Sequence, residues 1–123
     1  ACTSGNCGGA TGMEQSLDWV LYPNKAYVRG DGSTPIGTTN ASAIFTGALA
    51  NGITGAGSYA YTGFVANYTV GGWRCVNGGN DWQDSSAGAQ GSVGSVTTTD
   101  PSGSMYWTLD NCNTARPLYC AEQ

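Results

Sequence analysis

Five cysteines in a chain of 123 residues place the strongest constraint on the fold. They stand at Cys2, Cys7, Cys75, Cys112 and Cys120. A small domain with few charges and several cysteines is typical of an oxidising compartment, where disulfides persist. Zinc binding is the weaker alternative, because the chain has no second close cysteine pair and no histidine. We therefore expect a secreted or cell-surface domain built on disulfides, in which an odd count leaves one cysteine without an internal partner.

The composition indicates one globular domain spanning residues 1–123. Only 10% of the residues are charged, and 20 are glycine. Disorder normally requires low hydrophobicity and high net charge, and four Trp, seven Tyr and two Phe can supply a core. The net charge of −4 and the scattered basic residues argue against nucleic-acid binding. No apolar run approaches the roughly 20 residues of a membrane span.

Turn residues divide the chain into short segments, which predicts a β-rich domain with long ordered loops. Even the most helix-tolerant stretch, residues 41–53, contains glycines, so a long helix is not expected. Residues 71–95 are expected to form a long glycine-rich loop. Extended segments are expected at residues 17–22, 26–28, 58–70, 105–112 and 116–122.

Long loops in a small domain need something to hold them, and disulfides and tryptophans are the candidates. A bridge between Cys75 and Cys112 would tie the long loop to the last strands. We expect Trp82 and Trp107 in the core, because such a domain has few Leu and Ile residues. Trp73, between glycines and Arg-Cys, is the candidate for an exposed ligand-binding ring, and Tyr68 could contribute beside it.

The acidic residues raise two alternatives, catalysis and calcium binding. Without histidine the common general base is missing, so only a carboxylate pair involving Asp81 or Asp84 could support hydrolysis of a polysaccharide. We expect that the protein is not an enzyme. Ca²⁺ is a possible cofactor, since Asn77, Asn80, Asp81 and Asp84 supply hard oxygens on one loop. Turns satisfied by their own backbone are the simpler role for these side chains, and no metal site is assigned.

The tripeptide Arg29-Gly30-Asp31 matches an integrin-binding motif. However, Asp31-Gly32 is also a common tight-turn pair between two extended segments. We interpret the tripeptide as a turn.

The chain resembles C-type-lectin-like domains in its second half. The stretch YTGF (61–64) corresponds to the aromatic-x-Gly-hydrophobic strand of that fold, Trp107 precedes Asp110 and Cys112, and LYCAE (118–122) resembles the closing strand. The chain is more similar to a bacterial surface-protein family of unknown function that includes the leptospiral endostatin-like lipoproteins. The matching stretches, in order, are LDWVL (17–21), YVRGDGSTPIGTTNASAIFT (27–46), YTGF, NDWQDSSAGAQGSVG (80–94) and CNTARPLYCAEQ (112–123).

The resemblance implies an α+β fold, mostly β, that lacks the N-terminal strand and helix of a lectin-like domain. It also implies disulfides between Cys2 and Cys7 and between Cys75 and Cys112. Cys120 would then pair outside this chain, with an N-terminal cleavage fragment or a neighbouring subunit. In the alternative, Cys2 or Cys7 pairs with Cys120 and the other stays free.

Together these observations predict an extracellular recognition or adhesion module at a bacterial cell surface. The ligand would be a protein or a glycan, bound through the loop region 71–103. The alternatives are a structural subunit of an extracellular filament or surface layer and, less favoured, a polysaccharide-active enzyme.

Overall fold

The computed structural model describes residues 21–66, 68, 72–76 and 82–119. This part of the chain is mostly β, with two small antiparallel sheets and one short helix, as the composition and turn pattern predicted. Its elements are β1 (Ala26–Val28), β2 (Pro35–Thr38), β3 (Tyr59–Tyr61), β4 (Gln90–Ser95), α2 (Pro101–Met105) and β5 (Thr108–Asn111). None of its helices is long and apolar enough to cross a membrane.

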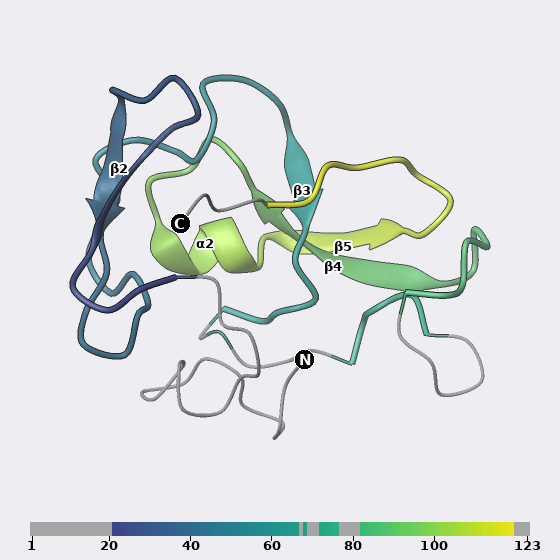
Figure 1. The fold of residues 1–123 in the computed structure, drawn as a ribbon. Coiled ribbons are helices and arrows are strands. Elements are labelled where there is room, and N and C mark those ends of the chain that lie inside the picture. The colour runs from purple at the N-terminus through teal and green to yellow at the C-terminus, as the bar shows by residue number, and fades with distance from the viewer. Residues whose placement is uncertain (1–20, 67, 69–71, 77–81, 120–123) are drawn as a thin grey trace.

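The hairpin β1–β2 forms the first sheet. Its register places Ala26 opposite Thr38, and the strand at residues 26–28 agrees with the sequence prediction. The buried hydroxyl of Thr39 closes the open end of the hairpin, because it donates to the carbonyl oxygen of Tyr22 at 2.6 Å and accepts from the amide of Lys25 at 3.0 Å. The hairpin stands at one side of the molecule, away from the second sheet (Figure 1).

The second sheet has the order β3-β4-β5, with β4 in the centre. The last half of β4 pairs with β3, and its first half pairs with residues 73–75 along the same side. After β5 the chain turns back, and Leu118 forms a parallel bridge with Tyr61 on the outer side of β3 (Figure 1). Strand β4 is therefore hydrogen-bonded along both sides and fixes the positions of three separate segments.

Helix α2 packs against β4 at very short range. The carboxylate of Asp100 caps the helix by accepting from the amide of Ser102, and Pro101 follows at the first helical position, where its missing N–H is not needed. A Cβ atom at Gly94 would lie 1.7 Å from the carbonyl oxygen of Ser104. Only glycine at this position lets the helix backbone approach the strand.

Two apolar clusters form the core of the described chain. One contains Ile36, Phe45 and Leu49, and the other contains Ile44, Tyr68 and Met105. Ile53 packs against both clusters and so connects the hairpin side of the molecule to the sheet side. Burial of a large apolar side chain stabilises a fold by about 1.5–3 kcal/mol, so this short list is consistent with a modest core.

Several sequence predictions of local structure were wrong. Residues 90–95, expected within a glycine-rich loop, form the central strand, with Gly91–Gly94 buried. Among the described residues of the expected strand at 58–70, only Tyr59–Tyr61 form a strand, and the described part of the expected closing strand contributes only the bridge at Leu118. Residues 41–53, in contrast, contain turns and bends and no helix, which agrees with the expectation that no long helix forms there.

The prediction that Trp82 and Trp107 belong to the core was also wrong. Trp82 is 46% exposed and Trp107 is 55% exposed. Aliphatic side chains together with Phe45, Tyr68 and Met105 fill the described core instead, and the two indole rings lie on its surface.

We predict that Gly94→Ala destabilises the domain by about 3 kcal/mol, because the new methyl group would force α2 away from β4. Chemical denaturation should show a lower midpoint with an unchanged slope. Gly47→Ala is the matched control, since a Cβ at Gly47 meets nothing within 4 Å. Equal midpoints for the two variants would contradict this packing.

Candidate functional site

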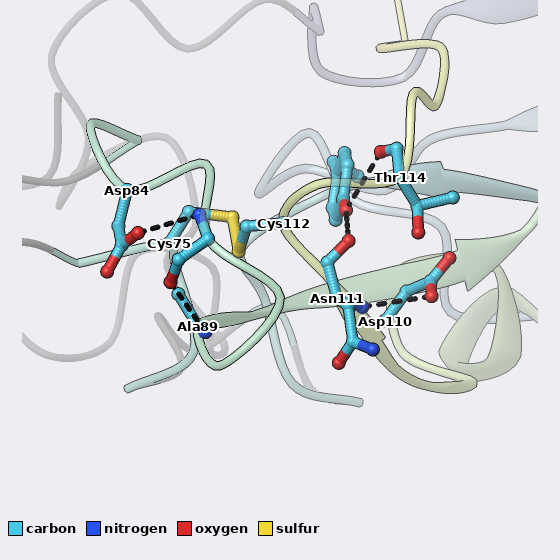
Figure 2. The surroundings of a disulfide bond; sticks show 9 residues. Cys75, Asp84, Ala89, Asp110, Asn111, Cys112 and Thr114 are labelled. Carbon is cyan, nitrogen blue, oxygen red and sulfur yellow. Dashed lines mark hydrogen bonds between the residues drawn. A yellow bond between two sulfur atoms is a disulfide. The ribbon is translucent and has the colours of Figure 1, made fainter.

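A disulfide joins Cys75 to Cys112 at the beginning of β4 (Figure 2). The two Cα atoms are 5.7 Å apart and 37 positions apart in sequence. The amide of Cys75 donates to the carbonyl oxygen of Gln90, and the amide of Cys112 donates to that of Ala89. The bond therefore connects the two segments that flank β4. It is the pairing that the family resemblance implied, while Cys2, Cys7 and Cys120 lie outside the described residues.

Beside this disulfide lie two short segments, residues 72–76 and 82–84, which we call the tryptophan arms. The amide of Trp82 donates to the carbonyl oxygen of Arg74 at 2.7 Å, and the amide of Asp84 donates to that of Cys75 at 2.9 Å. The arms expose Trp73 by 50%, Val76 by 38% and Trp82 by 46%. The expectation that Trp73 is exposed is thus met.

Tyr61 lies across β4 next to the tryptophan arms. A Cβ at Gly91 would meet the Tyr61 ring at 2.8 Å, so the ring occupies space that a side chain on β4 would take. Its hydroxyl donates to the carbonyl oxygen of Asn111 at 2.7 Å and lies 3.2 Å from that of Thr114. The burial of the hydroxyl, followed by the nearby carboxylate of Asp110, raises the pKa of Tyr61.

Trp82 and Arg116 contact the tyrosines of β3 from two directions. The ring of Trp82 meets that of Tyr61 edge to face, with 5.9 Å between centroids. The guanidinium of Arg116 stands 5.5 Å from the centroid of Tyr59, and its Nε donates to Asp110 at 2.7 Å. Tyr59 and Tyr61 are two residues apart on one strand, so their side chains share a face of the sheet. We call Tyr59, Tyr61 and Trp82 the aromatic row.

The acidic residues of this region act in turns and ion pairs. The carboxylate of Asp84 accepts from the amide of Ser86 at 2.8 Å, and this hydrogen bond lowers the pKa of Asp84. Asp110 accepts from the amide of Asn111 as well as from Arg116. In the part of the chain that is described, no three His, Cys, Asp or Glu side chains gather in a way that could hold a metal ion. The other calcium candidates, Asn77, Asn80 and Asp81, lie outside it.

The Arg-Gly-Asp tripeptide forms a turn, as we interpreted it from the sequence. The carboxylate of Asp31 accepts hydrogen bonds from the amides of Ser33 and Thr34 at 2.8 Å and from the Thr34 hydroxyl. These hydrogen bonds, above all the one from the Thr34 hydroxyl, hold the pKa of Asp31 well below its usual range. Arg29 donates to the carbonyl oxygen of Gly52 at 2.9 Å. Both charged ends of the tripeptide are thus engaged within the protein.

Tyr68 cannot serve as the ligand-binding residue that the sequence suggested, because only 4% of it is exposed. It packs with Ile44 and Met105, and its hydroxyl contacts the backbone of Phe45. Burial raises the pKa of Tyr68 to about 12. The proposed loop region 71–103 also needs correction, since β4 and most of α2 are buried. Within the described residues, its exposed aromatic rings are those of the tryptophan arms.

The sequence reasoning did not single out Tyr59, Tyr61 and Arg116. Alternation in Tyr59-Ala60-Tyr61 could have indicated two rings on one face of a strand, with the buried Ala60 on the other. The contact between Arg116 and Tyr59 joins segments 57 positions apart, and no local pattern reports it.

Comparison with known proteins gives one family. A family model described as a protein of unknown function, DUF1554, matches residues 1–99, which include β1 through β4. No curated protein and no solved structure matches the chain.

We predict that the double variant Cys75→Ala/Cys112→Ala loses about 4 kcal/mol of unfolding free energy, because the bond closes a loop of this length in the unfolded chain. Denaturant unfolding measures the loss. Amide hydrogen exchange should accelerate most at Gln90–Ser92, between the two released segments, and least around Ile36 and Leu49. An unchanged midpoint would show that backbone hydrogen bonds alone hold these segments.

We predict that Asp31 makes the domain more stable at neutral pH than in acid. Because its folded pKa is depressed, its contribution is fully present above the unfolded value near 3.8 and is lost as the pH falls below that value. The free energy of unfolding of Asp31→Asn should therefore change less between neutral pH and acid than that of the wild type. Asp84→Asn should also reduce the pH dependence of the free energy of unfolding, but by less than Asp31→Asn does. Superimposable pH curves for Asp31→Asn and wild type would be the contrary result.

Proposed function

The chain belongs to the DUF1554 family of proteins of unknown function, and we propose that it is an extracellular recognition module of a bacterial cell surface. It binds a protein or glycan ligand through the tryptophan arms and does not catalyse a reaction. The exposure of Trp73, Val76 and Trp82 around one disulfide carries this proposal. These three side chains lie on two segments that are hydrogen-bonded to each other, and large apolar side chains that gather on the surface of a soluble domain often mark a binding site.

The way in which the arms are held also supports recognition. Their backbones are fixed to β4, to each other and, through Cys75, to the end of β5. A backbone that is already ordered loses little conformational entropy when a ligand binds, so more of the contact energy appears as affinity. A disulfide in this position fits an oxidising location such as the cell exterior.

The carboxylates of the described residues give no support to the alternative of a polysaccharide-active enzyme, and the candidate Asp81 lies outside those residues. Hydrolysis by a carboxylate pair needs one group that stays protonated near neutral pH. The pKa of Asp84 is lowered by its turn, and Asp110 is paired with Arg116. The chain has no histidine to replace them. These observations favour a module without catalysis.

The proposal also covers the fold class of the domain and the proteins to which it is related. We propose a C-type-lectin-like fold, supported by the position of YTGF at β3, the disulfide that ends β5 and the return of residues 117–118 to β3. We also propose a relationship to the leptospiral endostatin-like lipoproteins, based on the sequence stretches that resemble them, which would place host matrix or plasma proteins among the ligands. It also supports the assignment to a bacterial surface.

We predict that Trp73→Ala reduces ligand binding about tenfold or more, because exposed tryptophans are frequent binding hot spots and truncation removes the ring. The probes are immobilised matrix and plasma proteins and a glycan array, with surface plasmon resonance as the readout. Trp107→Ala is the matched control, since Trp107 is equally exposed but lies outside the arms. If no probe binds the disulfide-intact wild type, or both variants bind like it, this function is wrong.

A further inference from the structure

We propose that the aromatic row and the flanking Arg116 form a calcium-independent binding site for a neutral oligosaccharide. This inference rests on the proposed recognition function and names the ligand class and the surface. It places the ligand on the face of the β3-β4-β5 sheet that carries Tyr59 and Tyr61, next to the tryptophan arms.

The first argument is the continuity of the aromatic surface. Arg116 contacts Tyr59, and Trp82 contacts Tyr61. The two tyrosines are separated by two strand positions, or about 7 Å. The two half-buried tyrosines therefore follow one another along β3, with Trp82 beside Tyr61, and this arrangement suits an extended chain of sugar rings better than a single small molecule. Aromatic faces pack well against the C–H faces of sugars.

The second argument is that the row is fixed in advance. Tyr61 lies in the space left by Gly91 and is held by its hydroxyl to the backbone after β5. Trp82 lies close to Gly63, where a Cβ would meet its ring at 2.8 Å. Because Gly63 has a φ of 71°, which disfavours any side chain, the space for the indole ring is maintained. Trp82 nevertheless remains 46% exposed and available for stacking.

The third argument is the polar groups beside the rings. Arg116 uses its Nε to bind Asp110, and a guanidinium has five N–H donors, so further donors can reach a ligand hydroxyl. The side chains of Arg116 and Asp110 are 27% and 22% exposed. The Tyr61 hydroxyl donates to Asn111 and can still accept a hydrogen bond. Rings with fixed donors and acceptors at their edges complement a ligand that carries apolar faces and hydroxyl rims.

The charges select a neutral ligand. The positive charge of Arg116 is balanced by Asp110 at 2.7 Å, and the whole chain carries −4. The Arg116–Asp110 pair therefore offers no uncompensated positive charge to an acidic sugar or a phosphate. Uncharged sugars are not repelled by the net negative charge of the chain, and they need no metal ion to bind.

The test is an NMR titration of the ¹⁵N-labelled, disulfide-intact chain with cellohexaose, xylohexaose and chitohexaose in the presence of EDTA. We expect at least one of them to bind saturably and to shift the indole signal of Trp82 and the amides of Tyr59 and Tyr61. Trp82→Ala should weaken that affinity about tenfold, because it removes one stacking ring. Trp82→Phe should keep most of the affinity, and Trp107→Ala should leave it unchanged.

Three outcomes would overturn the inference: no shift with any of the three sugars at millimolar concentration, binding that EDTA abolishes, or equal losses in Trp82→Ala and Trp107→Ala. Spectra of the free variants show whether each is folded, and Trp82→Phe keeps the test valid if Trp82→Ala unfolds. Binding of a matrix or plasma protein that depends on Trp73, without sugar binding, would refute the glycan site and leave the recognition function standing.

Discussion

The second sheet, helix α2 and the candidate site depend on the small side chains of strand β4. On one face Gly94 lets the backbone of α2 approach closely, and on the other Gly91 leaves room for the ring of Tyr61. Val93 between them is fully buried and anchors the strand. A central strand with larger side chains would push away the helix and the tyrosine. The packing of the core and the shape of the candidate site thus have one cause.

The disulfide acts on this same strand. Cys75 and Cys112 each donate a backbone hydrogen bond near the start of β4, and the covalent bond prevents the two flanking segments from separating. Backbone hydrogen bonds to β4 fix the position of residues 73–75 in the tryptophan arms, and the disulfide keeps these hydrogen bonds from opening. Stability and recognition therefore draw on the same few contacts.

Sequence reasoning succeeded where the signal was local. The strand at residues 26–28, the turn at Asp31 and the exposure of Trp73 follow from neighbouring residues, and the Cys75–Cys112 bond follows from the family resemblance. It failed where tertiary packing decides. The glycines of β4 read as a loop because their role is to admit Tyr61 and α2, which are distant in sequence. Tyr68 was expected at the surface and is buried, and Trp82 was expected in the core and is exposed, since aromatic residues suit both environments.

The backbone of the tryptophan arms shows that their exposed conformation is maintained against a cost. Cys75 and Trp82 have φ values of 53° and 62°, in the left-handed region that disfavours residues with a Cβ by about 1 kcal/mol or more each. Such residues persist where their surroundings determine the conformation. Here the surroundings are the disulfide at Cys75, the backbone bond from Trp82 to Arg74 and the contact of Trp82 with Tyr61. Tyr68, in the core, has a φ of 64° in the same region, so the left-handed conformation of Cys75 and Trp82 reflects the fixed packing of this part of the fold, and that packing sets the direction of the Trp82 ring.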